Sequence, residues 1–164
     1  MRTSGSNGGR TALALALTAA LFAVGCGDDE DEGSGESAAS TESVQEVTLT
    51  ADDISETEKT FELSATPTAE TETVVFDNVG DVPHALIFAK LNEGYTVDEA
   101  IELQGREGST EDIGQTDAPP GESTELKIKQ PLEPGDYVML CPIPNDEGTP
   151  HYELGQLEEF SVEG

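Results

Sequence analysis

The amino-acid sequence predicts an all-β protein, a Greek-key β-sandwich of about seven strands with one short helix. From Val44 onward, apolar and polar residues mostly alternate with a period of two, as they do in a strand with one buried face. Turns rich in glycine and proline separate these segments, for example Pro119-Pro120-Gly121 and Pro134-Gly135-Asp136. Short strands divided in this way favour an antiparallel sandwich.

Seven segments carry the strand pattern, and one segment between them is predicted to be helical. The predicted strands are Val47–Ala51, Phe61–Leu63, Thr73–Val79, His84–Leu91, Glu125–Lys129, Tyr137–Cys141 and Leu157–Val162. The run Thr96-Val97-Asp98-Glu99 is a capping box, and it predicts a short helix after the fourth strand that Gly105 ends. Residues 105–118 are mostly small or polar, and we expect them to form an exposed loop.

The composition limits the function classes. The 164 residues include 35 Asp and Glu but only 7 Lys and Arg, a formal net charge of -28. Such a surface repels phosphate groups, so we expect no direct nucleic-acid binding. The acidic residues are spread over every loop. This favours a generally solvated surface, as in salt-tolerant organisms, over a patch that steers a basic partner.

The N-terminal segment has the features of a secretion signal. Arg2 and Arg10 precede an apolar stretch of 13 residues, 12–24, which is too short to span a bilayer comfortably. The Gly25-Cys26 pair that follows resembles a bacterial lipobox. This resemblance implies that Cys26 is lipidated and becomes the first residue of the mature chain. An ordinary signal peptide that happens to end in a cysteine is the alternative.

The segment after Cys26 has the composition of a flexible linker. Residues 27–43 are almost entirely Gly, Ser, Ala, Thr, Asp and Glu, which cannot form a hydrophobic core. We therefore expect a lipoprotein signal peptide at 1–25, an acidic tether at 26–43 and one folded domain at 44–164. This organisation places the domain outside the cytoplasm, held to the bacterial cell membrane by its lipid.

Both histidines and the second cysteine lie in or beside short motifs. His84 ends the pattern F-x-N-x-G-x-x-P-H, Cys141 ends P-G-x-Y-x-x-x-C, and His151 follows Pro150. In these motifs and their order the sequence resembles the cupredoxins, the plastocyanin and pseudoazurin family of small blue-copper proteins, over 44–164. The resemblance implies a cupredoxin-like fold that binds one copper ion. It implies His84, Cys141 and His151 as equatorial ligands and Gln156 as the axial ligand.

General chemistry agrees with these assignments. Two imidazoles and one thiolate suit a copper ion that changes between two oxidation states. The two-residue period places Cys141 on one face of its strand with Tyr137 and Met139, and His84 on one face with Leu86. The alternative for Cys141 is a small buried apolar residue that binds no metal.

Two features depart from the usual cupredoxin pattern. Nine residues separate Cys141 from His151, more than is usual in the family, so His151 either reaches the metal or faces the surface. Gln156 stands where the family usually has methionine. Its amide oxygen can bind copper, or it is a solvated side chain on a site that has decayed.

These observations predict a membrane-anchored, extracytoplasmic copper-binding protein for one-electron transfer or copper handling. We expect a monomer with a redox protein partner, and not an enzyme, since the sequence contains no glycine-rich phosphate loop, no G-x-S-x-G and no H-E-x-x-H. A different class remains open, a metal-free cupredoxin-like module for binding or interaction at the cell surface.

Overall fold

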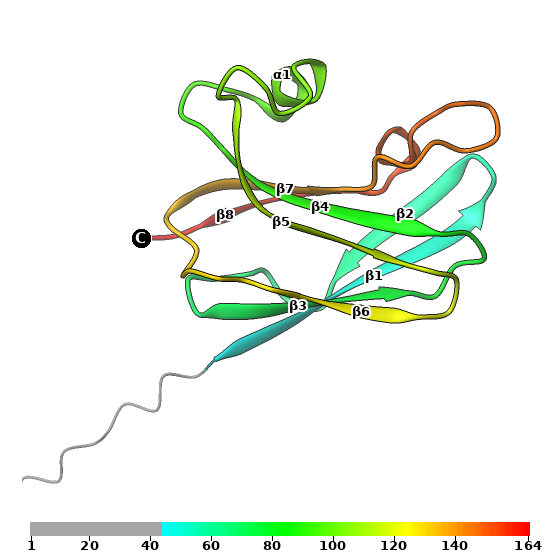
Figure 1. Ribbon diagram of the computed structural model, residues 1–164, viewed down its shortest axis with the longest axis horizontal. Coiled ribbons are helices and arrows are strands. Elements are labelled where there is room, and N and C mark those ends of the chain that lie inside the picture. The colour runs from blue at the N-terminus through cyan, green and yellow to red at the C-terminus, as the bar shows by residue number, and fades with distance from the viewer. Residues whose placement is uncertain (1–43) are drawn as a thin grey trace, which may run out of the picture. The chain divides into compact units, whose positions relative to one another are not determined.

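The computed structural model describes residues 44–164, so the predicted signal peptide, Cys26 and the tether lie outside the described residues. Two four-stranded sheets face each other, with the strand orders β2-β1-β3-β6 and β5-β4-β7-β8 (Figure 1). The elements are β1 (Gln45–Ser55), β2 (Glu58–Leu63), β3 (Thr71–Asn78), β4 (His84–Leu91), α1 (Val97–Glu102), β5 (Thr110–Ala118), β6 (Ser123–Lys127), β7 (Gly135–Leu140), the 3₁₀ helix η1 (His151–Leu154) and β8 (Leu157–Val162). The predicted all-β sandwich with one short α-helix is confirmed.

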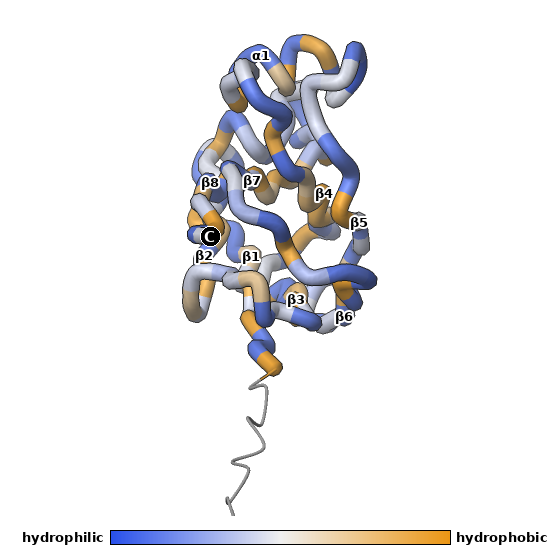
Figure 2. The backbone as a smooth tube through the Cα atoms, turned by 90° about the vertical axis from the view of Figure 1, so that its left-hand side faces the viewer, coloured by the Kyte–Doolittle hydropathy of each residue, from blue (hydrophilic) through white to orange (hydrophobic). Residues whose placement is uncertain are grey.

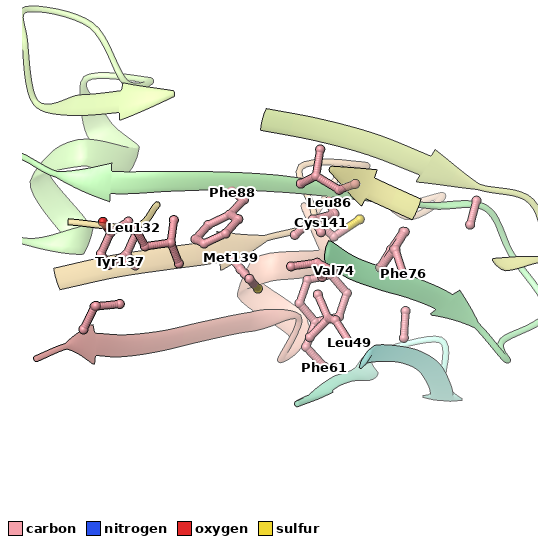
Figure 3. Packing of buried hydrophobic residues seen from close by; sticks show 14 residues of the cluster. Leu49, Phe61, Val74, Phe76, Leu86, Phe88, Leu132, Tyr137, Met139 and Cys141 are labelled. Carbon is pink, nitrogen blue, oxygen red and sulfur yellow. The ribbon is translucent and has the colours of Figure 1, made fainter. Parts of the chain in front are cut away.

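The core lies between the sheets and follows the alternation seen in the sequence. Side chains of both sheets meet there in Figure 3, where Phe76 of β3 and Phe88 of β4 are among those labelled. Hydrophobic and hydrophilic segments alternate along the strands in Figure 2, as expected when one face of each sheet is buried. Each fully buried large side chain contributes about 1.5–3 kcal/mol to stability. Cys141 belongs to the same cluster, directly after β7.

The helix α1 packs on the outer face of the second sheet. The side chain of Thr96 accepts a hydrogen bond from the backbone N–H of Glu99, and the Glu99 side chain accepts one from the N–H of Thr96, so the predicted capping box is confirmed. Val97 forms a small apolar cluster with Ala89 of β4 and Val138 of β7. Within residues 44–164, no helix combines the length and apolar composition needed to cross a bilayer.

The prediction of an exposed loop over 105–118 is wrong for its second half. Residues Thr110–Ala118 form β5, which pairs with β4 along its length. β5 lies at an edge of its sheet, and only Ala118 in it is fully buried. A polar edge strand of this kind is held by backbone hydrogen bonds to one neighbour, and these leave little hydrophobic signal in the sequence.

One pair of neighbouring strands departs from the antiparallel arrangement that the sequence favours. Among the described strands, β1 and β3 pair in parallel, whereas the other neighbouring strands pair antiparallel. β1 lies between β2 and β3 in its sheet. Because the chain reverses once from β1 to β2 and again before β3, β3 runs in the same direction as β1.

Candidate metal centre

A buried asparagine shapes the turn that presents His84. The Asn78 amide donates to the carbonyls of Val82 and Ala118, both at 2.9 Å, and its oxygen accepts from the N–H of Gly80 at 3.0 Å. These bonds fix the turn between β3 and β4, so His84 enters as the first residue of β4 with a fully buried ring. The F-x-N-x-G-x-x-P-H motif therefore has a local structural cause.

Cys141 follows the last residue of β7 and is fully buried. The N–H of Ala85 donates to its sulfur at 3.3 Å. Burial raises the pKa of the Cys141 thiol, and backbone hydrogen bonds from Ala85 and Ile143 oppose this only partly. The thiol of the metal-free protein therefore keeps its proton at neutral pH, and a metal ion that binds the sulfur must displace that proton.

The long segment after Cys141 folds back on itself, which returns His151 to the site. The N–H of Asn145 donates to the carbonyl of Thr149 at 2.8 Å, and the N–H of His151 donates to that of Ile143 at 2.8 Å. In Figure 1 this segment, in orange, projects at the end of the sandwich where β1 turns into β2. The extra residues thus form a small hairpin, and His151 is only 2% exposed. It faces the interior, not the surface.

The three predicted equatorial residues converge. The Nδ1 atoms of His84 and His151 lie 3.2 Å apart, and the Sγ of Cys141 lies 3.6 Å from Nδ1 of His151. One ligand atom from each residue lies within 4.8 Å of the other two. Two nitrogen lone pairs at such a distance repel each other unless a proton or a cation lies between them. The three side chains form a site that could hold a metal ion.

Both imidazoles are ready to bind a cation at neutral pH. Burial lowers the pKa of His84, against the attraction of the nearby Asp53 carboxylate. Burial, with the positive charges of Lys59 and of protonated His84, lowers the pKa of His151 to about 4. Both rings are therefore neutral at pH 7 and offer a nitrogen lone pair each.

Gln156 is fully buried beside the site, so it is not a solvated side chain. Its Nε2 lies 3.4 Å from the carbonyl oxygen of Thr60 and 3.4 Å from Nε2 of His84. Its Oε1 has no hydrogen-bond partner among the described residues. A buried carbonyl left without a partner costs about 1–3 kcal/mol, which coordination to a metal ion would offset. The donor set of two imidazoles, one sulfur and one free amide oxygen therefore fits copper.

Two charged residues that the sequence interpretation missed complete the site. The Oδ1 of Asp53 lies 3.3 Å from Nε2 of His84, and the buried ammonium of Lys59 donates to the same oxygen. A signal existed in the sequence. Asp53 continues the inward alternation of β1 after Leu49 and Ala51, and Lys59 does so in β2 two residues before Phe61. A charge at an inward position indicates a buried ion pair or a functional site.

Two glycines allow the surrounding segments to approach. Gly155 ends η1 with φ of 118°, and a Cβ there would collide with the carbonyl oxygen of Lys59. A Cβ at Gly80 would collide with the carboxylate of Asp53. The turn before His84 and the one after His151 therefore both depend on glycine.

The fold is a cupredoxin-like β-sandwich. It has two four-stranded sheets, and it brings His84, Cys141 and His151 together. Neither a protein-family model nor a curated protein matches the chain.

Among solved structures, the chain is similar to several small copper proteins. An auracyanin from Roseiflexus castenholzii is 24% identical, with 71% of this chain and 97% of that one covered and a TM-score of 0.46. Auracyanin A, a "blue" copper protein from Chloroflexus aurantiacus, is 20% identical, with 73% and 100% covered and a TM-score of 0.47. Rusticyanin is 18% identical, with 72% and 79% covered and a TM-score of 0.42.

Proposed function

We propose that this protein is a membrane-anchored, extracytoplasmic copper-binding protein that takes part in one-electron transfer or copper handling. The observation that carries the proposal is the convergence of two neutral imidazoles and one thiol in a buried site, where the ligand atoms lie within 4.8 Å of one another. This donor set is the one that copper uses in electron-transfer sites. The similar auracyanin A is described as a "blue" copper protein.

Each residue has a definite part in the proposed site. His84 and His151 bind through Nδ1, Cys141 binds through its sulfur after losing its proton, and Gln156 offers its free Oε1. A bound copper ion supplies a one-electron couple. The chain holds the ligands at the start of β4, directly after β7 and at the two ends of η1, and their burial excludes water, so the protein rearranges little when the charge of the site changes.

Gln156 affects which oxidation state of copper the proposed site prefers. An amide oxygen is a harder ligand than the thioether sulfur of methionine and favours the oxidised ion. We expect a lower reduction potential than in a relative with methionine at this position. The work of the site is electron exchange or ion storage, so no organic substrate and no catalytic residue is proposed.

The proposal includes the N-terminal segment. Lipidation of Cys26 would hold the domain to the outer or periplasmic face of a bacterial cell membrane, and the acidic residues 26–43 would act as the tether. The partner is a redox protein that meets the domain outside the cytoplasm. The domain acts as a monomer.

A copper titration tests this function. In a chain with Cys26→Ser, Cys141 is the only thiol, so any copper–thiolate signal comes from the proposed site. We expect Cu(II) to produce one intense visible thiolate-to-copper band that saturates at one ion per chain. Cys141→Ser should abolish the band, whereas Met139→Leu, which removes a neighbouring core sulfur, should keep it. A protein without the band, whose Cys141 also alkylates equally fast with and without copper, would be a metal-free binding module.

A further inference from the structure

A buried ion pair lies behind the proposed metal ligands. Lys59 is only 4% exposed, and its ammonium donates to Oδ1 of Asp53, which is itself mostly buried. The pairs Lys90–Glu133 and Lys127–Glu125 each include a largely exposed partner. Because two charges lose hydration when they are buried, such a pair is often no more stable than apolar residues in its place. Stability alone therefore does not explain this pair.

The Asp53 carboxylate contacts the Nε2 side of the His84 ring, opposite the Nδ1 that lies beside His151. Nδ1 of His84 points to His151, whereas Nε2 lies 3.3 Å from Oδ1 of Asp53. A metal ion on Nδ1 requires the ring proton to be on Nε2, where it needs an acceptor. Among residues 44–164, the other polar side-chain group near Nε2 is the amide nitrogen of Gln156, a donor, at 3.4 Å. Asp53 is therefore the available acceptor in a ring that is fully buried.

The carboxylate is itself held in place. Its Oδ2 accepts from the backbone N–H groups of Asp81 at 2.8 Å and Val82 at 3.1 Å, in the turn that leads into His84. Lys59 binds the other oxygen from β2, and the missing side chain at Gly80 lets the carboxylate lie against this turn, where a Cβ would collide with Oδ2. Asp53 thus connects β1, β2 and the turn before β4 at the point where the His84 ring must be fixed.

We propose that Asp53, held by Lys59, is a positioning residue of this centre. It accepts the Nε2 proton of His84, fixes the ring with Nδ1 toward the metal, and stabilises the oxidised ion by its negative charge. Lys59 keeps the carboxylate oriented and offsets part of that charge. This inference rests on the proposed copper function and names a residue that affects the copper affinity and the reduction potential of the site. Carboxylate partners of metal-binding histidines have this effect in other sites, where their loss lowers metal affinity about 10–100-fold.

The variant Asp53→Asn tests whether the negative charge of Asp53 affects copper binding. The variant keeps an oxygen that can accept from His84 but removes the negative charge. We expect the affinity for Cu(II) to fall by about tenfold relative to that for Cu(I), which raises the reduction potential by about 59 mV for a one-electron couple. Asp81→Asn is the matched control, because it removes an exposed charge from the same turn and keeps the backbone N–H that binds Asp53. It should change the potential much less.

A second variant tests the positioning and avoids a lone buried lysine. Asp53→Ala combined with Lys59→Met removes both charges together, which proteins often tolerate without loss of stability. We expect it to unfold at a temperature close to the wild type, yet to bind copper about 10–100-fold more weakly. In NMR spectra of the zinc-loaded protein, the Nε2 proton of His84 should exchange slowly in the wild type and rapidly in this variant.

The outcomes separate this inference from the proposed function. If the wild type binds copper and both Asp53 variants keep its potential, affinity and proton exchange, Asp53 does not position His84 and the inference is overturned while the copper site stands. If the wild type binds no copper, the proposed function fails. The exchange of the His84 proton in the zinc-loaded protein then still decides the role of Asp53: slow exchange that the double variant abolishes supports it, and equal exchange overturns it.

Discussion

A single glycine, Gly155, allows the backbone of Lys59 in β2 to lie close to the end of η1. Gly155 has φ of 118°, a conformation that residues with a Cβ rarely adopt, and its Cα faces the carbonyl oxygen of Lys59. The unusual backbone conformation and the close contact with Lys59 both occur shortly after His151 and directly before Gln156. The position therefore links the backbone of β2 to two of the four proposed ligands.

Gly155→Ala should destabilise the domain and disturb the site. The strained backbone alone costs about 1–3 kcal/mol, and the collision with Lys59 adds to it. Chemical unfolding measures the loss, and copper titration measures the effect on binding. Gly148→Ala is the control, because Gly148 also has positive φ, 86°, but has open space around it. Equal losses in the two variants would mean that the contact with Lys59 is unimportant.

The proposed metal ligands were easier to find in the sequence than the residues that support them. His84 and Cys141 end motifs whose turns and strand period fix their positions, so the sequence indicates both their place and their direction. Asp53 and Lys59 had only one signal, their inward positions in β1 and β2, and this signal indicates a buried charge without indicating its partner. Their contact with His84 depends on how β1, β2 and the following turn pack together, which no local pattern encodes.

The hairpin between Cys141 and His151 is the element that makes the long spacing compatible with a metal site. The side chain of Asn145 accepts from the N–H groups of Glu147 at 3.0 Å and Thr149 at 2.9 Å and closes the turn. The sequence could predict a turn here, but not that the turn would bring its two ends together. That outcome depends on backbone bonds such as His151 to Ile143.

Asn145→Ala should loosen this hairpin. Two hydrogen bonds of the turn are lost, each contributing about 0.5–1.5 kcal/mol, and His151 becomes less well fixed. We expect lower stability and weaker copper binding in equilibrium unfolding and competition titrations. Asp146→Ala, at the exposed neighbouring position, should leave both unchanged. An Asn145→Ala protein with the affinity of the wild type would show that His151 is held by other contacts.

Edge strand β5 is a secondary-structure element that the sequence pattern does not predict. Its residues are mostly polar, and its hydrogen bonds to β4 are backbone bonds that any sequence without proline can form. The core strands β4 and β7 were predictable because burial on the inner face selects apolar residues. The parallel pairing of β1 and β3 follows from the path of the chain between them. The alternation of apolar and polar residues does not predict it, because the alternation is the same in parallel and antiparallel strands.

The net charge of the whole protein makes the proposed lipid anchor necessary for membrane attachment. With a formal net charge of -28, the protein is repelled by anionic lipid head groups, so its own surface gives no reason to stay at a membrane. Membrane attachment therefore depends on Cys26 in this account.

Cys26→Ser should release the protein from membranes. We expect fractionation of cells to place the wild type with the membranes and the variant in the soluble extracytoplasmic fraction. Cys141→Ser is the control, because it removes the other cysteine and should leave attachment unchanged. A Cys26→Ser protein that still fractionates with membranes would contradict the lipid anchor.

X-ray absorption at the copper edge, on the protein loaded with one ion per chain, identifies the atoms that hold the metal. We expect one short-range sulfur scatterer, from Cys141, together with two imidazole nitrogens, from His84 and His151. A first shell made only of nitrogen and oxygen would contradict this expectation, because the buried thiol would then take no part in holding the metal.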